Sequence, residues 1–289
     1  MLQLFADTDC DITKRHAEEL GYKLISMPYS IGDKLVCPYE DWDEFDSHEF
    51  YETLRSGTLP KTSSISEEKY IEYFEPIFEK GDDIFYAHFS RSMSGTFERM
   101  DEAVKKLLEK YPERKFYEVD LKGISALCLN LLKEIGEKAK TGMSGEELKK
   151  WTEGEVDHFA LYFFADDLRF FKQSGRVSNL AGTMGTLLGI RPIIYVDNEG
   201  KMLSIGKEKG RFKAAEKLIS YVKDLGQDIK NHRIIIASSD NDELVEEIKK
   251  RLIEEFGEDL NIETETINPT IGAHCGPDAV GICFYAKHR

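Results

Sequence analysis

Short apolar runs alternate with amphipathic, charged runs along most of this chain. The apolar runs have the length of β-strands, and the charged runs place hydrophobic residues at helical spacing. The pattern predicts strands over residues 2–7, 23–31, 83–89, 115–120, 158–165, 232–239, 260–267 and 279–286. It predicts helices over residues 12–21, 46–57, 66–81, 95–111, 123–142, 144–154, 166–175, 179–189, 211–226 and 242–257.

The two halves of the chain follow different rhythms. Strands and helices alternate in the first half, which predicts a parallel α/β sandwich with helices on both faces of the sheet. The second half contains a hairpin over residues 191–207 that turns at 198–200, so an α+β domain with a mixed sheet is expected there. We therefore predict an α/β protein of two domains, residues 1–152 and residues 153–289.

Composition and charge narrow the classes of function. The chain has 289 residues, 41% of them hydrophobic, and a formal net charge of −15. This charge argues against binding to nucleic acid and to anionic membrane surfaces, since both need basic residues. No apolar run approaches the length of a membrane span, and the first residues lack the cationic start of a signal peptide. Five cysteines without C-x-x-C spacing argue against a disulfide framework and a zinc site, so a reduced, cytoplasmic protein is expected.

Small hydroxyl side chains gather where predicted elements meet. The segment "SRSMSGT" (90–96) lies between a predicted parallel strand and a helix, at the strand end where open α/β sheets bind ligands. The Ser94 hydroxyl, with the backbone N–H groups of Gly95 and Thr96, could bind a carboxylate or phosphate without a cation. The alternative is that Ser94 only caps the helix.

The segment "KTSSIS" (61–66) has the same ambiguity. Ser64 and Glu67 have the spacing of a capping box, which predicts the start of a helix. Thr62 and Ser63 are then not needed for capping, and their hydroxyls could donate hydrogen bonds to an oxyanion. They suit an ordinary Ser/Thr turn equally well.

Four charged or titratable residues have more than one possible role. Arg176, in "SGRVS", could meet an anion with two hydrogen bonds, tie two loops together or lie on the surface. His274 stands beside a Gly-Pro turn, as a structural residue or as a catalyst, and adjacent Cys275 is unsuited to pair with it. Asp7 and Asp9 follow the first strand and could hold a metal or stabilise a turn. The chain has no Walker loop and no G-x-S-x-G nucleophile elbow.

Five segments, in order along the chain, resemble motifs of the DegV family of fatty-acid-binding proteins. "FADTDCDI" resembles the family's D-S-T-x-D-L stretch, "KTSSIS" its T-S-Q-P-S motif, and "SRSMSGTF" its S-S-x-L-S-G-T-Y motif. "KQSGRVSNLAGTMGTLLGIRPII" is similar to K-x-G-G-R-I-S with L-L-x-I-K-P-I, and "HCGPDAVGICFY" to H-x-G-P-G-A-L-G-x-x-F. The chain departs from these motifs at Ser64, Ile65, Ser174 and Asp278.

The resemblance implies two α/β domains that hold one long-chain fatty acid, such as palmitate, between them. It places the ligand carboxylate near Thr62 and Ser94, with backbone N–H groups around Ser63 and Gly95. It places His274 close to the head group. It also puts Arg176 at the rim, on the side of the second domain.

The resemblance further implies a carrier without catalysis, with no cofactor and no metal, that presents its lipid to a fatty acid kinase for acyl-phosphate formation. Asp278, where the family has glycine, must turn away from the anion site, because an acid there would weaken carboxylate binding.

Burial of the lipid tail is expected to dominate affinity. A C16 chain has about 14 methylenes, each worth about 0.8 kcal/mol on burial, or about 11 kcal/mol before entropy losses. The runs "FALYFFA" and "AGTMGTLLGI" are candidates to line the tunnel, and plain core is the alternative for both. Two other functions stay open: a hydrolase or acyltransferase that uses Ser94 or Thr62 with His274, and a regulatory protein whose lipid is structural.

Overall fold

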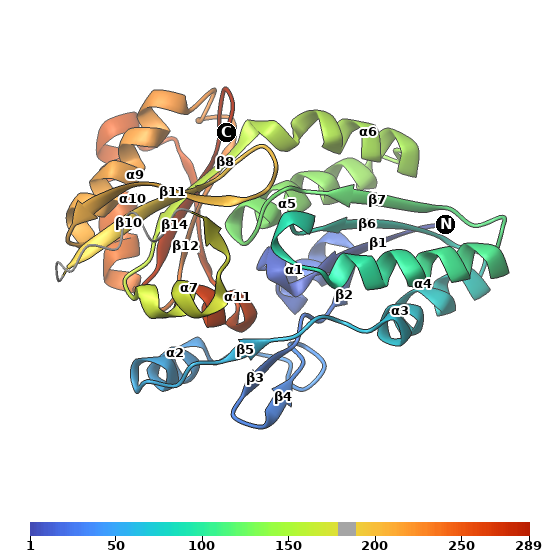
Figure 1. The fold of residues 1–289 in the computed structure, drawn as a ribbon. Helices are drawn as coiled ribbons and strands as arrows, with labels where there is room; N and C mark the ends of the chain where they lie inside the picture. The colour runs from blue at the N-terminus through green and yellow to red at the C-terminus, as the bar shows by residue number, and fades with distance from the viewer. Residues whose placement is uncertain (179–188) are drawn as a thin grey trace.

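The computed structural model describes residues 1–178 and 189–289 (Figure 1). The helix predicted over 179–189 therefore lies outside the described residues, apart from Gly189. Within the described residues, no helix combines the length and the apolar character needed to cross a membrane.

The N-terminal sheet has four parallel strands in the order β2–β1–β6–β7. They are β1 (Leu2–Asp7), β2 (Tyr22–Ile25), β6 (Asp83–His88) and β7 (Phe116–Asp120). Because all four run in the same direction, their carboxyl ends meet at one edge of the sheet. The predicted parallel arrangement is confirmed.

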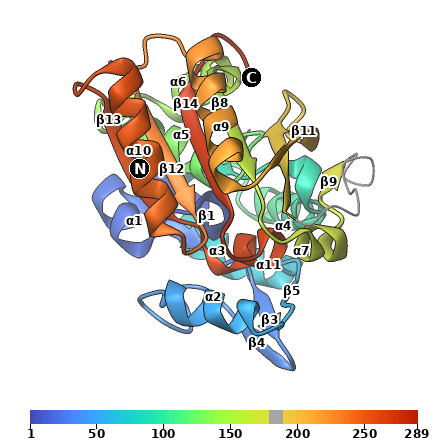
Figure 2. The ribbon, with the colours of Figure 1, turned by 90° about the vertical axis from the view of Figure 1, so that its left-hand side faces the viewer.

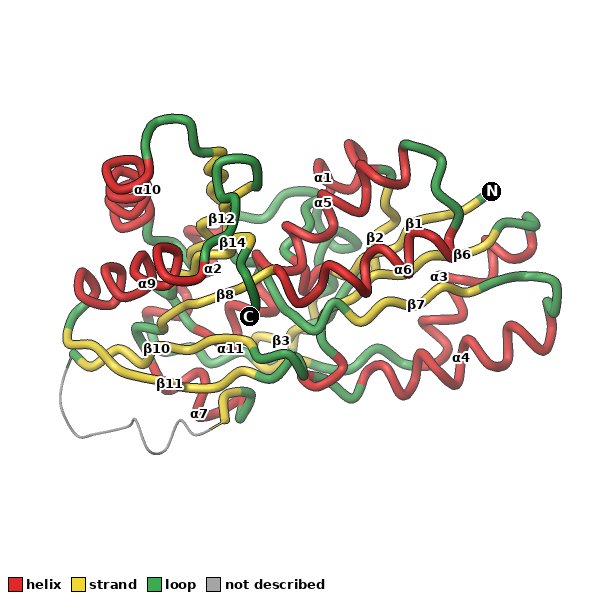
Figure 3. Tube along the Cα trace, turned by 90° about the horizontal axis from the view of Figure 1, so that it is seen from above, coloured by secondary structure: helices red, strands yellow, loops and turns green. Residues whose placement is uncertain are grey.

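Helices cover both faces of this sheet, as the alternating pattern predicts (Figure 1). One face carries α3 (Glu67–Glu79) and α4 (Thr96–Lys110), which pack on each other. The other carries α1 (Lys14–Leu20), α5 (Ala126–Lys140) and α6 (Gly145–Glu155). Seen from above, α5 lies between the N-terminal sheet and the second sheet, and it packs against strands of the latter (Figure 3).

The C-terminal sheet is mixed, in the order β13–β12–β14–β8–β10–β11–β9. Among its described strands, only the β12–β13 and β11–β9 pairs are parallel. Its strands are β8 (Phe159–Phe164), β9 (Val177–Ser178), β10 (Ile190–Val196), β11 (Met202–Lys209), β12 (Arg233–Ser238), β13 (Asn261–Thr266) and β14 (Val280–Tyr285). The expected hairpin over 191–207 is the β10–β11 pair. The predicted fold class, a parallel sheet followed by a mixed one, is confirmed.

Strand β8 separates two apolar environments. Ala160, Tyr162 and Phe164 face the core under α9 (Arg211–Leu225) and α10 (Asp242–Phe256). Leu161 and Phe163 point to the opposite face of the sheet. This alternation follows from the two-residue period of a strand, and it leaves one face of β8 free to line a cavity.

The strand predicted over 23–31 is wrong as a single element. Strand β2 ends at Ile25, and β3 (Tyr29–Ile31) belongs to a separate small sheet, in the order β4–β3–β5. Pro28 stands at the break, where its missing N–H could not take part in a ladder. The other strands of the small sheet are β4 (Lys34–Val36) and β5 (Lys61–Thr62).

Helix α2 (Ser47–Arg55) packs with the small sheet around Tyr29, Phe50 and Tyr51. Figure 2 shows α2 and the β3–β4 hairpin below α11 (Pro269–Cys275). The sequence pattern predicts no helix at α11. Asn268 caps it by accepting from the N–H groups of Thr270 (2.8 Å) and Ile271 (3.1 Å), and Pro269 follows at the first helical position. An Asn-Pro pair of this kind marks a helix start and is the signal that could have found α11.

The β10–β11 turn contacts a loop of the N-terminal half. Ser92 Oγ donates to Glu199 O at 2.6 Å. Gly200 has φ +74°, and a Cβ there would stand 2.9 Å from Ser90 Cβ and 3.0 Å from Lys122 Cα. Glycine is therefore required at this turn both by conformation and by close approach. The domain boundary expected near residue 152 falls within α6 and stays a prediction.

Candidate ligand-binding site

A pocket opens at the carboxyl edge of the N-terminal sheet. All four strand ends contribute to it: Asp9 after β1, Met27 after β2, Ser94 after β6 and Ser125 after β7. The chain runs from β1 to β2 on one side and then crosses back to β6 on the other side of β1. Such a switch point leaves a crevice between neighbouring loops, which is where open α/β sheets bind ligands.

The opposite wall belongs to the C-terminal half. It is formed by strands of the C-terminal sheet with α7 (Leu168–Ser174) and α11. The pocket holds about 960 Å³ of space not filled by atoms, part of it open to solvent. Its apolar lining includes Met27, Phe89, Met93, Ile124, Leu161, Phe163, Phe171, Met202, Ile267, Ile271 and Val280.

Within the predicted segment "FALYFFA" (159–165), Leu161 and Phe163 line the pocket and the other five residues do not. The segment "AGTMGTLLGI" lies outside the described residues except for its last two positions.

Thr62 and His274 meet in the wall of the pocket. Thr62 ends β5, and His274 lies in the last turn of α11. Their Oγ1 and Nε2 atoms are 3.1 Å apart, while His274 Nδ1 is buried and has no hydrogen-bond partner among the described residues. Burial, with the positive charge of Arg176 as a smaller cause, lowers the pKa of His274 from 6.5 to about 4. At neutral pH His274 is therefore an uncharged hydrogen-bonding group.

Ser94 combines the two roles considered from the sequence. Its Oγ accepts from the Thr96 N–H at 3.2 Å at the start of α4, and the residue also lines the pocket. A hydroxyl that accepts one bond keeps its own proton to donate. Gly95 is exposed and is not among the lining residues, and a Cβ there would meet nothing within 4 Å.

The capping box predicted at Ser64 is wrong. Helix α3 begins at Glu67, and Ser66 caps it by accepting from the Lys69 N–H at 3.2 Å. The start is two residues later than the S-x-x-E spacing indicates, so Ser64 is free of that duty, and Ser63 and Ser64 both line the pocket.

The backbone of the same segment is partly occupied. The Ser63 N–H donates to Pro28 O at 3.2 Å, so it is already paired. The Ile65 N–H donates to Thr96 Oγ1 at 3.0 Å, and the side chain is buried. A proline, which the family motif has in place of Ile65, could not make this bond.

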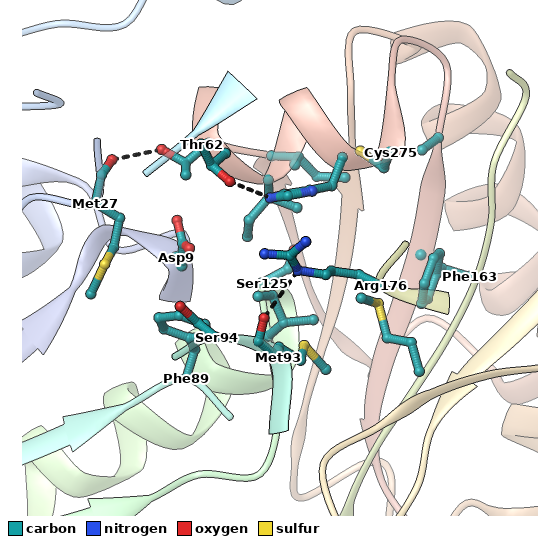
Figure 4. Close-up of a pocket in the computed structure, with 18 of the residues that line it drawn as sticks. Asp9, Met27, Thr62, Phe89, Met93, Ser94, Ser125, Phe163, Arg176 and Cys275 are labelled. Carbon is teal, nitrogen blue, oxygen red and sulfur yellow. Dashed lines mark hydrogen bonds between the residues drawn. The ribbon is translucent and has the colours of Figure 1, made fainter. Parts of the chain in front are cut away.

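Arg176 brings a positive charge to this part of the pocket. Its Nε donates to Met93 O at 3.2 Å and its Nη1 to Ser174 O at 2.5 Å, so it ties two loops together. Figure 4 shows its guanidinium extending into the pocket, toward the side that carries Asp9 and Ser94. The interpretations as a loop tie and as an anion ligand are thus compatible.

Asp278 points away from the pocket, as expected for an acid at this position. Its carboxylate meets Arg55 Nη2 at 3.2 Å and Arg211 Nη2 at 3.0 Å, and the residue is not part of the lining. Asp278 has φ +60°, a conformation in which glycine is unstrained and aspartate is tolerated. Ser174, the other departure in a glycine position, ends α7 and donates to Phe171 O at 3.3 Å.

Three buried carboxyl groups lie close together beside the pocket, in and around the short 3₁₀ turn Thr8–Cys10 after β1. Asp7 accepts from the Phe89 N–H at 3.1 Å and from the Tyr86 hydroxyl at 3.2 Å. Asp11 accepts from the N–H and Nδ2 of Asn268, each at 2.8 Å. Burial raises the pKa of Asp7 to about 6 and that of Asp11 to about 7.

Asp9 is the member of this group that lines the pocket. Burial first, and then the neighbouring Asp7 and Asp11, raise the pKa of Asp9 well above its ordinary value. From the sequence, Asp9 was a candidate only for binding a metal or stabilising a turn. Ser125 and Thr270 also line the pocket and were not predicted; Thr270 Oγ1 donates to Met27 O at 2.8 Å.

The sequence profile of the family described as "Uncharacterised protein, DegV family" matches residues 1–287. The chain belongs to the DegV family. A DegV domain-containing protein of Clostridium perfringens is 30% identical over 284 residues, which cover 97% of this chain and 96% of that protein. The family resemblance seen in five sequence segments is therefore confirmed over nearly the whole length.

Solved structures of DegV proteins share this fold. A DegV family protein from Thermus thermophilus, described by its fatty acid binding, superposes with a TM-score of 0.86 at 22% identity, with 99% of each chain covered. The Streptococcus pneumoniae fatty acid kinase B3 protein, loaded with linoleic acid, has a TM-score of 0.82 at 19% identity, over 99% of this chain and 100% of that chain.

Proposed function

We propose that this DegV protein binds one long-chain fatty acid between its N-terminal and C-terminal halves, with the boundary between the two domains near residue 152. The observation that carries the proposal is that one pocket combines a largely apolar wall with several hydroxyl side chains. Two DegV proteins of the same fold are described with fatty acid binding or with linoleic acid bound.

The apolar wall suits the tail of the lipid. Side chains from both halves of the chain line the pocket, and they would shield a bound tail from water. Each buried methylene contributes about 0.8 kcal/mol, and tail burial therefore supplies most of the affinity.

The head group is assigned to the hydroxyl side chains. Thr62, Ser63 and Ser94 supply hydroxyl donors, and Arg176 supplies a cation. His274 positions the Thr62 hydroxyl through their 3.1 Å contact. Hydrogen bonds to a charged group are worth about 1.5–3 kcal/mol each, so two or three of them offset the desolvation of a carboxylate. Gly95 has no side chain, and we propose that it contributes only its backbone N–H to the head-group site.

The chain then acts as a carrier that presents its lipid to a fatty acid kinase. The fold shared with a protein named as the fatty acid kinase B3 protein supports this step. We propose no cofactor and no metal, and a reduced, cytoplasmic setting in which the five cysteines stay free thiols.

Lipid extraction tests the proposal. The purified chain is denatured, extracted with organic solvent and examined by mass spectrometry, and we expect about one long-chain fatty acid per chain. Delipidated protein should regain the same stoichiometry when incubated with oleate. Recovery of no lipid, together with no uptake of oleate, would reject the function.

A second candidate is an enzyme with Thr62 as nucleophile, since its Oγ1 lies at hydrogen-bond distance from His274 Nε2. Among the described residues no carboxylate orients His274 Nδ1, and the low pKa of this histidine makes it a weak base. Turnover of p-nitrophenyl acyl esters that is lost in Thr62→Val and His274→Gln would establish the enzyme instead of the carrier.

A further inference from the structure

Asp9 differs from the two acids beside it. Asp7 and Asp11 each accept hydrogen bonds from backbone and side-chain donors. No described residue donates a hydrogen bond to the Asp9 carboxyl group or forms an ion pair with it, and its Oδ1 is buried without a partner. The residue is only 7% exposed. A buried carboxyl group without donors is costly unless it is neutral or a ligand completes it.

The carboxyl group of Asp9 is directed into the pocket. Asp9 is a lining residue, and its backbone is held by the Ser125 N–H, which donates to Asp9 O at 2.9 Å. Figure 4 shows Asp9 between Met27 and Ser94, on the side of the pocket that faces the Arg176 guanidinium. The unpartnered oxygen therefore belongs to the part of the wall to which the head group is assigned.

We propose that Asp9 is a positioning residue for the ligand: in its protonated form it donates its O–H to one oxygen of the fatty acid carboxylate. This inference rests on the proposed function. No bond is made or broken. The carboxyl groups of Asp9 and the fatty acid then share one proton and carry one negative charge. The guanidinium of Arg176 faces this charge.

The surroundings favour this arrangement. Asp7 and Asp11 flank Asp9 along the chain, and their ionised forms disfavour a third charge between them. Arg176 and the neutral His274 line the same pocket. If Asp9 were ionised, the ligand anion would enter beside a like charge. Two carboxyl groups at one site commonly resolve this repulsion by sharing a proton.

The consequence is a pH-dependent affinity. Binding of the anion requires one proton on Asp9, so affinity falls as the pH rises through the pKa of Asp9, by up to about tenfold per pH unit. Among the neighbouring groups, Asp7 and Asp11 titrate near neutrality. The pKa of His274 is about 4 and that of Cys275 about 12, so both titrate outside the range from about pH 6 to about pH 10.

Three forms of the full chain test the inference: wild type, Asp9→Asn and Asp9→Leu. Asparagine keeps a hydrogen-bond donor and cannot ionise, while leucine has a similar size and no donor. Binding of radiolabelled oleate to delipidated protein is measured from about pH 6 to about pH 10, the range set by the neighbouring groups. Asp7 and Asp11 are present in all three forms, so the difference between profiles isolates residue 9.

We expect wild-type affinity to fall with rising pH, Asp9→Asn to have a flatter profile, and Asp9→Leu to bind about tenfold more weakly than Asp9→Asn at every pH. Infrared spectra of the oleate-bound protein should show a protonated carboxyl band that weakens as the pH rises and that Asp9→Asn lacks. Parallel profiles for wild type and Asp9→Asn, or equal binding by Asp9→Leu, would overturn the inference while leaving the carrier function intact. Absence of oleate binding by wild type would reject the carrier function itself.

Discussion

Thr62 Oγ1 and His274 Nε2 lie 3.1 Å apart although 212 positions separate the two residues in the chain. The first ends a strand of the small sheet, and the second lies in a helix that precedes the last strand of the C-terminal sheet. Their contact brings the two halves of the chain together at the pocket.

The hydroxyl pair assigned to the head group gives the first prediction. Thr62→Ala combined with Ser94→Ala removes two donors to the carboxylate, and we expect affinity for oleate to fall about 100-fold or more. The measurement is equilibrium binding to delipidated protein. Ser66→Ala is the matched control: it removes the cap of α3 and about 1 kcal/mol of stability, but leaves affinity unchanged. Equal binding by the double variant would contradict the site assignment.

His274 gives a prediction about stability and pH. Its pKa is about 4 in the folded chain and 6.5 in the unfolded chain, so between these values the unfolded state binds more protons. Stability therefore falls as the pH drops from 6.5 toward 4. Urea unfolding of delipidated wild type and His274→Gln across this range measures the effect. We expect the free energy of unfolding of wild type to fall more steeply than that of the variant; parallel curves would show that His274 is not held neutral.

The close approach at Gly200 predicts a loss of stability. Gly200→Ala forces a positive φ on alanine and places its Cβ against Ser90 and Lys122, at a cost of about 3 kcal/mol. Gly21→Ala is the control, because Gly21 has φ +81° with nothing within 4 Å of the added Cβ, and we expect about 1 kcal/mol there. Thermal or urea unfolding compares them. An equal loss of stability in both variants would mean that the β10–β11 turn can shift to accommodate the added Cβ without a further loss of stability.

The two faces of β8 predict separable effects. Leu161→Phe fills part of the pocket, so affinity should fall more for an eighteen-carbon acid than for a twelve-carbon acid. Phe164→Leu changes the opposite face and should cost about 1 kcal/mol of stability without altering chain-length preference. Competition binding with acids of graded length measures the preference. A profile like that of wild type for Leu161→Phe would place the tail elsewhere.

Local patterns predicted most elements correctly because each is specified by its own residues. The continuous apolar run of 159–164 and the helical period of 96–110 each follow from the sequence within one element. The prediction of a single strand over 23–31 failed because Pro28 interrupts the apolar run between β2 and β3. Prediction from local patterns also failed at α11, whose start is marked only by Asn268 and Pro269.

The sequence by itself determined the DegV motifs, the parallel and mixed sheets, and the residues from which a head-group site could be chosen. Only the tertiary structure decided that Thr62 and His274 touch, that Ser66 rather than Ser64 caps α3, and that Asp9 faces the pocket without a donor among the described residues. The physical reason is range. Periodicity and caps act within a few residues, whereas the partners of a buried polar group are set by packing between segments that lie far apart in the chain.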